Sequence, residues 1–440
     1  MRHPVAICLL WLLALLPAII FLLITSAADW RNTAALLNTL GRLAGVAGLS
    51  FMLVAAMLSS RVPGFDKAFG GLTKLWVSHH QLAAVSFLLL LMHPLLLAFS
   101  ATTVSLNNGI RILLPTRENL EVILGWLALI SLMVFLAPSF AFFGEPKYQR
   151  WKYLHKIAAV ALILSLLHSF LLAREINYWW ESTIWAVFTL LAMLAVLYRW
   201  GFSRLHWFKR HGRLQYQVAG VERPIVGVVE IELKPMQVGL IYEPGQFIYL
   251  TPYDKQLRAG YGQEHPFTLS SSPTEDNLRI SVKDLGDASR ALQSTKLGSN
   301  VRVEGPYGAF FRSSVDEESE LWIAGGIGIA PFISRARYFA GEETEIDVHC
   351  FLCVQDEARS LYQQELQTIA DKLPGFNFTP HFFYREGPLN AKFVQQHCPD
   401  FQSRICYLCG PPAMLKCVRQ FLRQAGVSRK YIQTEEFNLL

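Results

Sequence analysis

Two apolar stretches carry histidines at spacings that suit metal binding inside a membrane. One reads WVSHHQLAAVSFLLLLMHPLLL and contains His79, His80 and His93, and the other reads YLHKIAAVALILSLLHSF and contains His155 and His168. An ionisable side chain within a membrane span is costly, so each is a candidate functional residue. The two histidines at the ends of each stretch are thirteen or fourteen residues apart, which is roughly 20 Å along a helix axis.

This arrangement predicts two haems stacked across the bilayer. Imidazoles are axial ligands of haem iron, and two of them leave no vacant position on the metal. The inner haem would be held by His79 and His155, and the outer haem by His93 and His168. The alternative is that the histidines line a polar cavity or relay protons.

Helical phase separates the candidates for the inner haem. Fourteen residues return almost to the same face of a helix, which favours His79 over His80 as the partner of His93 in the first stretch. The thirteen residues from His155 to His168 do not return to one face. We therefore expect a π-bulge, a kink or an oblique ligand approach in the second stretch.

Six apolar stretches are long enough to cross a hydrocarbon core about 30 Å thick. They lie near residues 5–25, 34–58, 76–99, 120–143, 154–173 and 180–200. Lys and Arg are concentrated in the loops on one side, which predicts an inner-membrane protein with both termini in the cytoplasm. We interpret the first stretch as a retained helix, without a typical cleavage site. This topology explains the net charge of +6 better than nucleic-acid binding does.

The C-terminal half has the pattern of two further domains. Short alternating stretches between about residues 214 and 311, separated by Gly, Pro and Asn, predict a small antiparallel β-barrel. From about residue 320 strands alternate with helices, which predicts a doubly wound parallel sheet. The expected domains are a six-helix haem bundle over 1–208, the barrel over 209–315 and the α/β domain over 316–440.

Four short motifs in these domains point to nucleotide binding. The barrel contains HPFTLSSSP and VKDLGDASRAL, and the sheet domain contains AGGIGIAPF and CGPPAML. A glycine-rich turn after a strand lets backbone N–H groups approach a pyrophosphate, and the following helix N-terminus favours its charge. Such a turn is common by itself. Here it follows HPFT and precedes CGPP along the chain, and this order of motifs makes the prediction of nucleotide binding specific.

Two C-x-x-C pairs invite a metal hypothesis. They are Cys350 with Cys353 and Cys406 with Cys409, and the spacing is one that zinc and iron–sulfur sites use. Each pair lies in an apolar, strand-like stretch, where free cysteine packs as a small hydrophobic residue. We favour packing.

The histidines and the motifs together resemble the ferric reductase and NADPH oxidase superfamily, from the second apolar stretch to Phe437. In that superfamily a six-helix di-haem domain is fused to a unit that binds FAD and NAD(P). The resemblance implies that electrons pass from cytoplasmic NAD(P)H through FAD and two b-type haems to an extracytoplasmic acceptor. That acceptor would be a ferric chelate, or dioxygen giving superoxide.

The resemblance also implies roles for single residues. The four paired histidines match the haem ligands. The residues implied for FAD are His265, Pro266, Phe267, Thr268, Gly286 and Ser289. Those implied for NAD(P)H are Gly325, Gly326, Gly328, Pro331, Cys409, Gly410 and Pro411. The residues closest to the chemistry would be Thr268 near the flavin ring, Cys409 beside the nicotinamide and Phe437 covering the flavin.

Several points stay open. Oxygen-reducing members tend to carry one more histidine where this chain has Leu97, and Arg42 could be a cationic residue near the outer haem or an interfacial anchor. Gln355, Asp356 and Glu357 stand where an arginine would bind a 2′-phosphate, so the choice between NADH and NADPH is open. A second hypothesis is an electron feeder for a periplasmic protein that docks on the outer loop at 100–119. A third is a metal-binding or transport protein gated by the flavin domain.

Overall fold

The computed structural model describes residues 3–62, 64–114, 119–136, 153–172, 178–200, 214–255, 257, 260–311, 319–342 and 345–435 of the 440-residue chain. The chain forms two compact units. The first comprises His3–Arg61 and Lys74–Arg204, and the second comprises Val62–Thr73 and Leu205–Leu440. The short segment Val62–Thr73 groups with the second unit, and the predicted domain boundaries stay a prediction.

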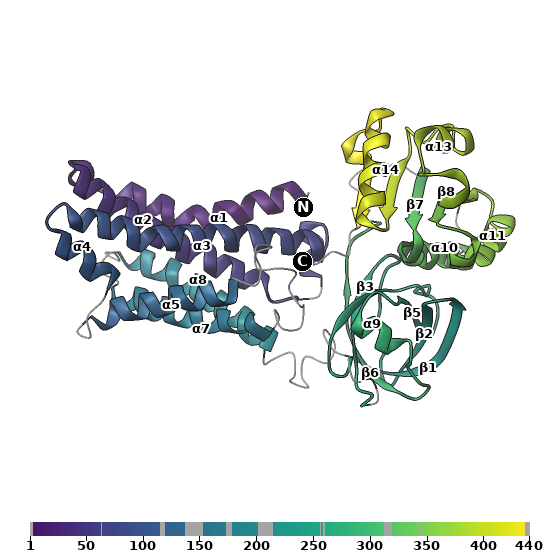
Figure 1. Ribbon diagram of the computed structural model, residues 1–440, viewed down its shortest axis with the longest axis horizontal. Helices are drawn as coiled ribbons and strands as arrows, with labels where there is room; N and C mark the ends of the chain where they lie inside the picture. Colours follow the sequence, from purple (N-terminus) through teal and green to yellow (C-terminus); the bar gives the residue numbers. More distant parts are fainter. Residues whose placement is uncertain are drawn as a thin grey trace. The chain divides into compact units, whose positions relative to one another are not determined.

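The first unit consists of helices (Figure 1). They are α1 (His3–Ile24), α2 (Thr33–Leu58), α3 (Leu72–Thr102), α4 (Leu106–Leu113), α5 (Leu120–Leu136), α7 (Ile157–Leu171) and α8 (Trp179–Trp200). Four of the described helices, α1, α2, α3 and α8, are long and apolar enough to cross a membrane. The helices α5 and α7 are apolar but shorter, and α5 ends beside residues outside the described ranges. The chain is a membrane protein, and six spans stay a prediction.

Close packing of α2 against α3 depends on three glycines on one face of α2, at Gly41, Gly45 and Gly48. A Cβ atom at Gly41 would lie 2.8 Å from the Leu97 side chain, and one at Gly48 would lie 2.7 Å from the Leu90 side chain. Real Cβ atoms do not come so close to other atoms. Glycine therefore lets the α2 backbone touch α3, and carbonyl groups of α2 become reachable for side chains of α3.

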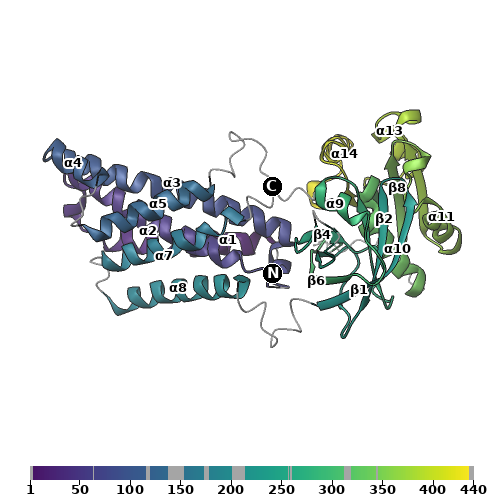
Figure 2. The same ribbon diagram turned by 60° about the horizontal axis from the view of Figure 1, so that its bottom comes forward.

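A curled antiparallel sheet forms the first part of the second unit (Figure 2). Its strands are β1 (Leu214–Ile225), β2 (Val228–Pro235), β3 (Phe247–Pro252), β4 (His265–Thr268), β5 (Leu278–Lys283) and β6 (Asn300–Tyr307). Their order is β4-β3-β6-β1-β2-β5. The two ends approach each other just after β4, where the Ser270 N–H donates to the Arg279 carbonyl over 2.8 Å. One short helix, α9 (Asp287–Leu292), follows β5.

A parallel sheet of five strands forms the second part, as the alternating pattern predicts. Its strands are β7 (Ser319–Gly325), β8 (Asp347–Val354), β9 (Phe376–Phe382), β10 (Ile405–Cys409) and β11 (Ile432–Glu435), in the order β11-β10-β7-β8-β9. Its helices are α10 (Ala330–Glu342), α11 (Gln363–Lys372), α12 (Phe383–Glu386), α13 (Ala391–His397) and α14 (Pro412–Gln424). Apolar residues of α10 and α11 pack on one face, and those of α13 and α14 pack on the other.

The C-x-x-C pairs lie on strands β8 and β10, where a separation of three residues points the two side chains to opposite faces. Cys350 and Cys409 belong to the core under α10, whereas Cys353 and Cys406 belong to the core under α14. Burial raises the pKa of Cys353 and of Cys406 to about 12. Protonated thiols on opposite faces of a sheet pack as apolar groups and do not converge on one ion.

The barrel and the parallel sheet share a core. Val228 of β2 and Phe310, just after β6, are buried together with Trp322 of β7 and Phe332 of α10. The segment Val62–Thr73 also contacts the barrel, since the Asp66 carboxylate accepts a hydrogen bond from the Gly308 N–H over 3.0 Å. Burial raises the pKa of Asp66, and the bond from Gly308 opposes that shift.

Candidate functional site

The four paired histidines of the first unit come together in two pairs. The ring centroids of His79 and His155 are 6.2 Å apart, and those of His93 and His168 are 6.3 Å apart. His79 and His93 come from α3, His168 from α7 and His155 from the turn just before α7. These are the pairs that the spacing predicts.

Three of these histidines are oriented by backbone carbonyls. The Nδ1 atom of His79 donates to Ala55 O over 2.8 Å, that of His93 to Gly41 O over 2.7 Å, and that of His168 to Glu121 O over 2.6 Å. Such a bond determines the tautomer and leaves Nε2 as the free ligand atom. His80 is exposed, and its ring lies 6.4 Å from that of Trp76. The geometry thus agrees with the preference for His79.

The pair separations fit a metal held between two imidazoles. A metal–imidazole bond is about 2.0 Å long, and the ring centre lies about 1.2 Å beyond the nitrogen, so the ring centres of two axial ligands are about 6.4 Å apart. The observed 6.2 Å and 6.3 Å agree with this value. The residues present therefore fit two haems, although their role as ligands stays a prediction.

The backbone at His155 departs from a regular α-helix. The Lys156 N–H donates to Tyr153 O, and the Ala158 N–H donates to His155 O, which are bonds to the third preceding residue instead of the fourth. A turn of this kind winds more tightly than an α-helix and changes the angular relation between the residues on either side. The tight turn around His155 is thus an irregularity of the kind that the thirteen-residue spacing from His155 to His168 led us to expect.

Sequence reasoning missed two glycines that pack against the outer pair. A Cβ atom at Gly45 of α2 would lie 2.8 Å from Nδ1 of His93, and one at Gly125 of α5 would lie 2.8 Å from Cε1 of His168. In both helices the carbonyl that accepts the histidine Nδ1–H belongs to the residue four positions earlier, Gly41 or Glu121. The G-x-x-x-G of α2 at Gly41 and Gly45 could have indicated close packing, but the sequence around Gly125 carries no such signal.

The flavin motif of the barrel forms β4, which pairs with β3. Phe247 is opposite Thr268 and Tyr249 is opposite Pro266. Thr268 is buried, whereas His265, Pro266 and Phe267 are half-buried. The second predicted FAD step lies at the start of α9, where the Ser289 hydroxyl accepts from the N–H groups of Leu285 and Gly286 and donates to Gly286 O. Ser289 therefore holds its own turn, and a contact with FAD stays a prediction.

The two nicotinamide motifs meet at the carboxyl ends of neighbouring parallel strands. β7 pairs with β10, and the strands beyond them lie on opposite sides, so this is the switch point where open α/β sheets bind ligands. A Cβ atom at Gly328 would press on the Cys409 carbonyl, and one at Gly325 would lie 2.7 Å from Pro411 and from Met414. The glycines thus let the two turns touch, as the predicted site requires.

The other residues predicted to bind NAD(P)H differ in how close they lie to the contact between the two turns. Pro331 is buried in the first turn of α10. Gly410 approaches Gly325 closely, because a Cβ atom at Gly410 would lie 2.9 Å from the Gly325 Cα atom. The Cys409 side chain is fully buried in the core under α10, and burial raises its pKa. Contact between its thiol and the nicotinamide stays a prediction, and Phe437 lies outside the described residues.

The turn after β8, where the ribose selectivity of such sheets is determined, contains both signs of charge. Asp356 begins the short helical turn Glu357–Arg359, and its carboxylate forms an ion pair with the guanidinium of Arg359. The exposed side chains of Phe383 and Tyr384 follow the adjacent strand β9. An arginine is therefore present in this turn, but it is paired with Asp356.

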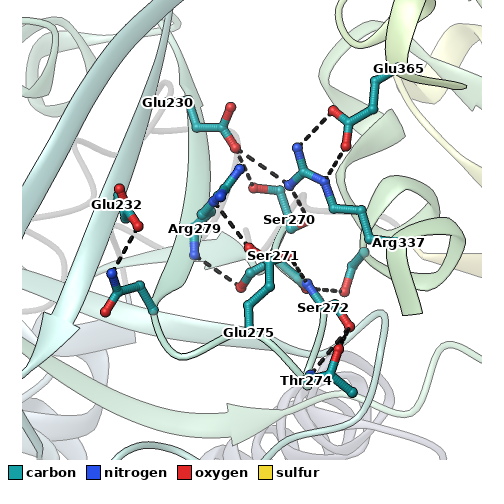
Figure 3. A network of polar contacts seen from close by, with 12 residues as sticks. Glu230, Glu232, Ser270, Ser271, Ser272, Thr274, Glu275, Arg279, Arg337 and Glu365 are labelled. Atoms are coloured by element: carbon teal, nitrogen blue, oxygen red, sulfur yellow. Dashed lines mark hydrogen bonds and ion pairs between the residues drawn. The ribbon is translucent and has the colours of Figure 1, made fainter. Parts of the chain in front are cut away.

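Polar side chains also connect the barrel to the parallel sheet (Figure 3). Arg337 of α10 forms an ion pair with Glu365 of α11 over 2.6 Å and lies 3.6 Å from Glu230 of β2. Its guanidinium donates to Ser270 O over 2.8 Å. Neither Arg337 nor Ser270 has a predicted role in the site, and a charged residue within a helix usually indicates a solvated face.

Outside these contacts, Arg42 of α2 lies 3.8 Å from Asp29 and its guanidinium lies over the Phe21 ring at 5.3 Å. Both partners lie close to the connection between α1 and α2, on the predicted outer side. These contacts are those of an anchored surface cation, and a role toward a haem stays a prediction.

Three family models match the chain in succession. The ferric reductase like transmembrane component matches residues 44–166, the FAD-binding domain matches residues 215–310, and the oxidoreductase NAD-binding domain matches residues 322–420. The first match contains His79, His93 and His155 and ends two residues before His168. The second contains the HPFT strand, and the third contains both nicotinamide motifs.

Several known proteins are similar to part of the chain. The glycine betaine monooxygenase reductase subunit of Chromohalobacter salexigens is 26% identical over 212 residues, which are 44% of this chain and 56% of that protein. The toluate 1,2-dioxygenase electron transfer component of Pseudomonas putida is 25% identical over 233 residues, 51% of this chain and 67% of that protein. This chain thus spans just over half the length of the reductase subunit.

Among solved structures, the Amycolatopsis cytochrome P450 reductase is similar with a TM-score of 0.45 and 25% identity, over 51% of this chain and 69% of that one. The flavohemoglobin from Malassezia yamatoensis is similar with a TM-score of 0.49 and 16% identity, over 92% of this chain and 97% of that one.

Proposed function

The chain has the domain combination of the ferric reductase and NADPH oxidase superfamily, and from that premise we propose that it moves electrons across a membrane. The donor is NAD(P)H on the cytoplasmic side, and the acceptor is a ferric chelate or dioxygen on the other side. The carriers between them are FAD and two b-type haems. The observation that carries this proposal is the presence of two histidine pairs, each with a separation that suits one haem iron.

Electron number determines the order of the carriers. A nicotinamide gives up two electrons as a hydride, a haem takes one, and a flavin can do both, which is the chemistry that FAD supplies when bound. The residues of β4, from His265 to Thr268, would hold the flavin ring. The turn from Gly325 to Gly328 would hold the dinucleotide pyrophosphate through its N–H groups, beside the N-terminus of α10.

The two histidine pairs would divide electron transfer across the membrane into two shorter transfers. His79 and His155 lie toward the ends of their stretches that the charge pattern assigns to the cytoplasm, so this pair would receive electrons from the flavin. His93 and His168 lie about four helical turns further along, so this pair would deliver electrons outside. His93 and His168 would each hold the outer haem by an imidazole nitrogen, and the haem would supply one-electron transfer to the acceptor.

Composition of the purified protein tests this proposal. We expect two b-type haems and one FAD per full-length chain, and a reduced-minus-oxidised spectrum that appears on addition of NADH or NADPH without oxygen. A chain that retains FAD but binds no haem would contradict the electron path and favour a flavin reductase anchored to a membrane. A chain whose histidines bind a metal ion without haem would favour the transport hypothesis.

A further inference from the structure

One helix connects the nicotinamide turn to the flavin segment. α10 starts at Ala330, directly after the turn Gly326–Ile329. Ser334 and Arg337 lie one turn apart on α10, so their side chains share a face. The Ser334 hydroxyl donates to Ser271 O over 2.6 Å, and the Arg337 guanidinium donates to Ser270 O over 2.8 Å.

The two carbonyls belong to the segment that directly follows the flavin strand. Ser270 and Ser271 are two and three residues beyond Thr268, and both are fully buried. The segment is held from the barrel side as well, because Ser270 N–H donates to Arg279 O over 2.8 Å and the Tyr242 hydroxyl lies 2.7 Å from Ser271 Oγ. Such a segment cannot shift without breaking several buried hydrogen bonds.

Arg337 is held in turn by its own partners (Figure 3). Glu365 accepts two hydrogen bonds from it, over 2.6 Å and 2.8 Å, which determines the plane of the guanidinium as well as its position. The Arg337 guanidinium also lies over the Tyr362 ring at 5.1 Å, and only 9% of the side chain is exposed. Burial raises the pKa of Glu230, and the nearby Arg337 opposes that shift.

We infer that Ser334 and Arg337 are positioning residues that set the nicotinamide turn against the flavin strand for hydride transfer. This inference rests on the proposed function. α10 carries the turn at one end, and its two side chains bind main-chain atoms of the barrel. Both contacts are made to main-chain carbonyls of the barrel, so they tie the position of α10 to the backbone of the segment after β4.

Hydride transfer is sensitive to such positioning. The reacting atoms must approach to about 3–3.5 Å, and a displacement of about 1 Å reduces the rate on the order of a hundredfold. Loss of an ordinary packing contact would lower thermal stability without a specific effect on this step. The two roles therefore separate in a comparison of hydride-transfer rate with stability.

Arg335 provides the matched control on the same helix. Its side chain is 18% exposed and forms an ion pair with Glu320 of β7 over 2.7 Å. The Arg335 guanidinium also lies over the ring of Phe311, just after β6, at 4.3 Å. Neither of these two contacts involves Ser270 or Ser271. Replacement of Arg335 by Met removes an ion pair whose N–O distance of 2.7 Å is close to the 2.6 Å between Arg337 and Glu365. The effects of Arg335→Met and Arg337→Met on stability can therefore be compared.

The experiment is anaerobic stopped-flow reduction of FAD in the full-length protein by NADH and by NADPH. For Arg337→Met we expect a rate constant about 10–100-fold lower than in the parent, with the dinucleotide dissociation constant and FAD content nearly unchanged. Arg337→Lys should recover part of the rate. Arg335→Met should lower the melting temperature and leave the rate constant within about twofold of the parent.

Equal rate constants in Arg337→Met and the parent, or equal losses in Arg337→Met and Arg335→Met, would overturn the inference. Should Arg337→Met lose its FAD, Ser334→Ala decides instead, since it removes one hydroxyl and leaves the helix intact. A rate constant at the parental value in Ser334→Ala would then count against positioning. Absence of flavin reduction in the parent with either nicotinamide would contradict the proposed function, and this outcome is visible before any variant is compared.

Discussion

The proposed haem site and the proposed dinucleotide site are built from opposite kinds of atoms. In the first unit three imidazole rings from helices and one from the turn before α7 come together in two pairs. In the second unit the turns after β7 and β10 touch at Gly325, Gly328 and Gly410, where an added Cβ atom would collide with neighbouring atoms. A site made of side chains can be recognised from residue types, whereas a site made of backbone depends on where side chains are absent.

The two kinds of site should therefore fail in different ways. Removal of a ligand side chain should abolish one haem and leave the fold intact. Addition of a single carbon atom to the backbone site should disturb both folding and binding, because the neighbouring atoms belong to another strand.

Loss of an outer ligand is the largest expected effect. His93→Ala and His168→Ala should each reduce the haem content of the purified protein from two per chain to one. Each substitution removes one of the two expected ligands, and we expect a single remaining histidine to bind haem too weakly for the haem to be retained. The measurement is pyridine haemochrome content against protein, with FAD content as the internal reference. His80→Ala is the matched control and should retain both haems. Full haem content in His93→Ala would refute the assignment of the pairs.

An added methyl group at the nicotinamide turn should have the next largest effect. The Cβ atom of Gly328→Ala would press on the Cys409 carbonyl, so one of the two turns must move. We expect a loss of about 1–3 kcal/mol of stability, the usual result of overpacking, together with weaker NAD(P)H binding. Thermal unfolding and dinucleotide titration of the FAD-loaded protein measure both.

Gly341→Ala is the control for that substitution. Gly341 lies near the end of α10, and its added Cβ atom would come no nearer than 3.8 Å to another atom. Alanine favours a helix by up to about 1 kcal/mol over glycine, so this variant should be as stable as the parent or more stable. Equal destabilisation by Gly328→Ala and Gly341→Ala would show that close approach of the turns does not matter.

Substitution of Gly45 and Gly125, which pack against His93 and His168, tests whether the proposed haem site depends on backbone as well as on side chains. In Gly125→Ala the added carbon would lie 2.8 Å from the His168 ring, and in Gly45→Ala it would lie 2.8 Å from the His93 ring. We expect each variant to weaken outer-haem retention by about 10–100-fold, the range for changes around metal ligands, and to shift the midpoint potential of that haem alone. Unchanged potentials in both variants would show that the backbone of α2 and α5 does not influence the outer haem site.

The smallest effect concerns the choice of nicotinamide. Asp356→Asn would release Arg359 from its ion pair and remove a negative charge near the expected ribose. Because both side chains are partly exposed, the gain is at most about 1 kcal/mol, or about fivefold in the ratio of NADPH to NADH efficiency. Steady-state kinetics with both donors provides the ratio. An unchanged ratio, or a shift toward NADH, would exclude this turn as the determinant.

Sequence reasoning was most successful where residue type and period carry the information. The histidine pairs and the parallel sheet follow from spacing and alternation, and the structure brings the pairs together and contains the sheet. The preference for His79 as a haem ligand stays a prediction. Sequence reasoning did not identify β11 (Ile432–Glu435) or α4 (Leu106–Leu113), because both elements are short and α4 lies in a connection between two longer apolar stretches. The helix α4 lies in the connection at 100–119, the predicted outer loop where the periplasmic-partner hypothesis places a docking surface.

The backbone groups that hold these side chains could not be predicted. The carbonyls of Gly41 and Glu121 accept from histidines 52 and 47 residues away in the chain. The carbonyls of Ser270 and Ser271 accept from side chains 67 and 63 residues away. Every residue has a carbonyl, so nothing in the sequence marks the one that a folded chain uses.

Electron transfer across a sealed membrane tests the central claim most directly. The purified chain is inserted into lipid vesicles that enclose an impermeant ferric chelate, and NADH or NADPH is added outside. We expect anaerobic reduction of both haems and then of the enclosed chelate, in the parent but not in His93→Ala. Reduction of the chelate only after the vesicles are opened with detergent, or reduction at the parental rate in His93→Ala, would contradict transmembrane electron transfer through the histidine pairs.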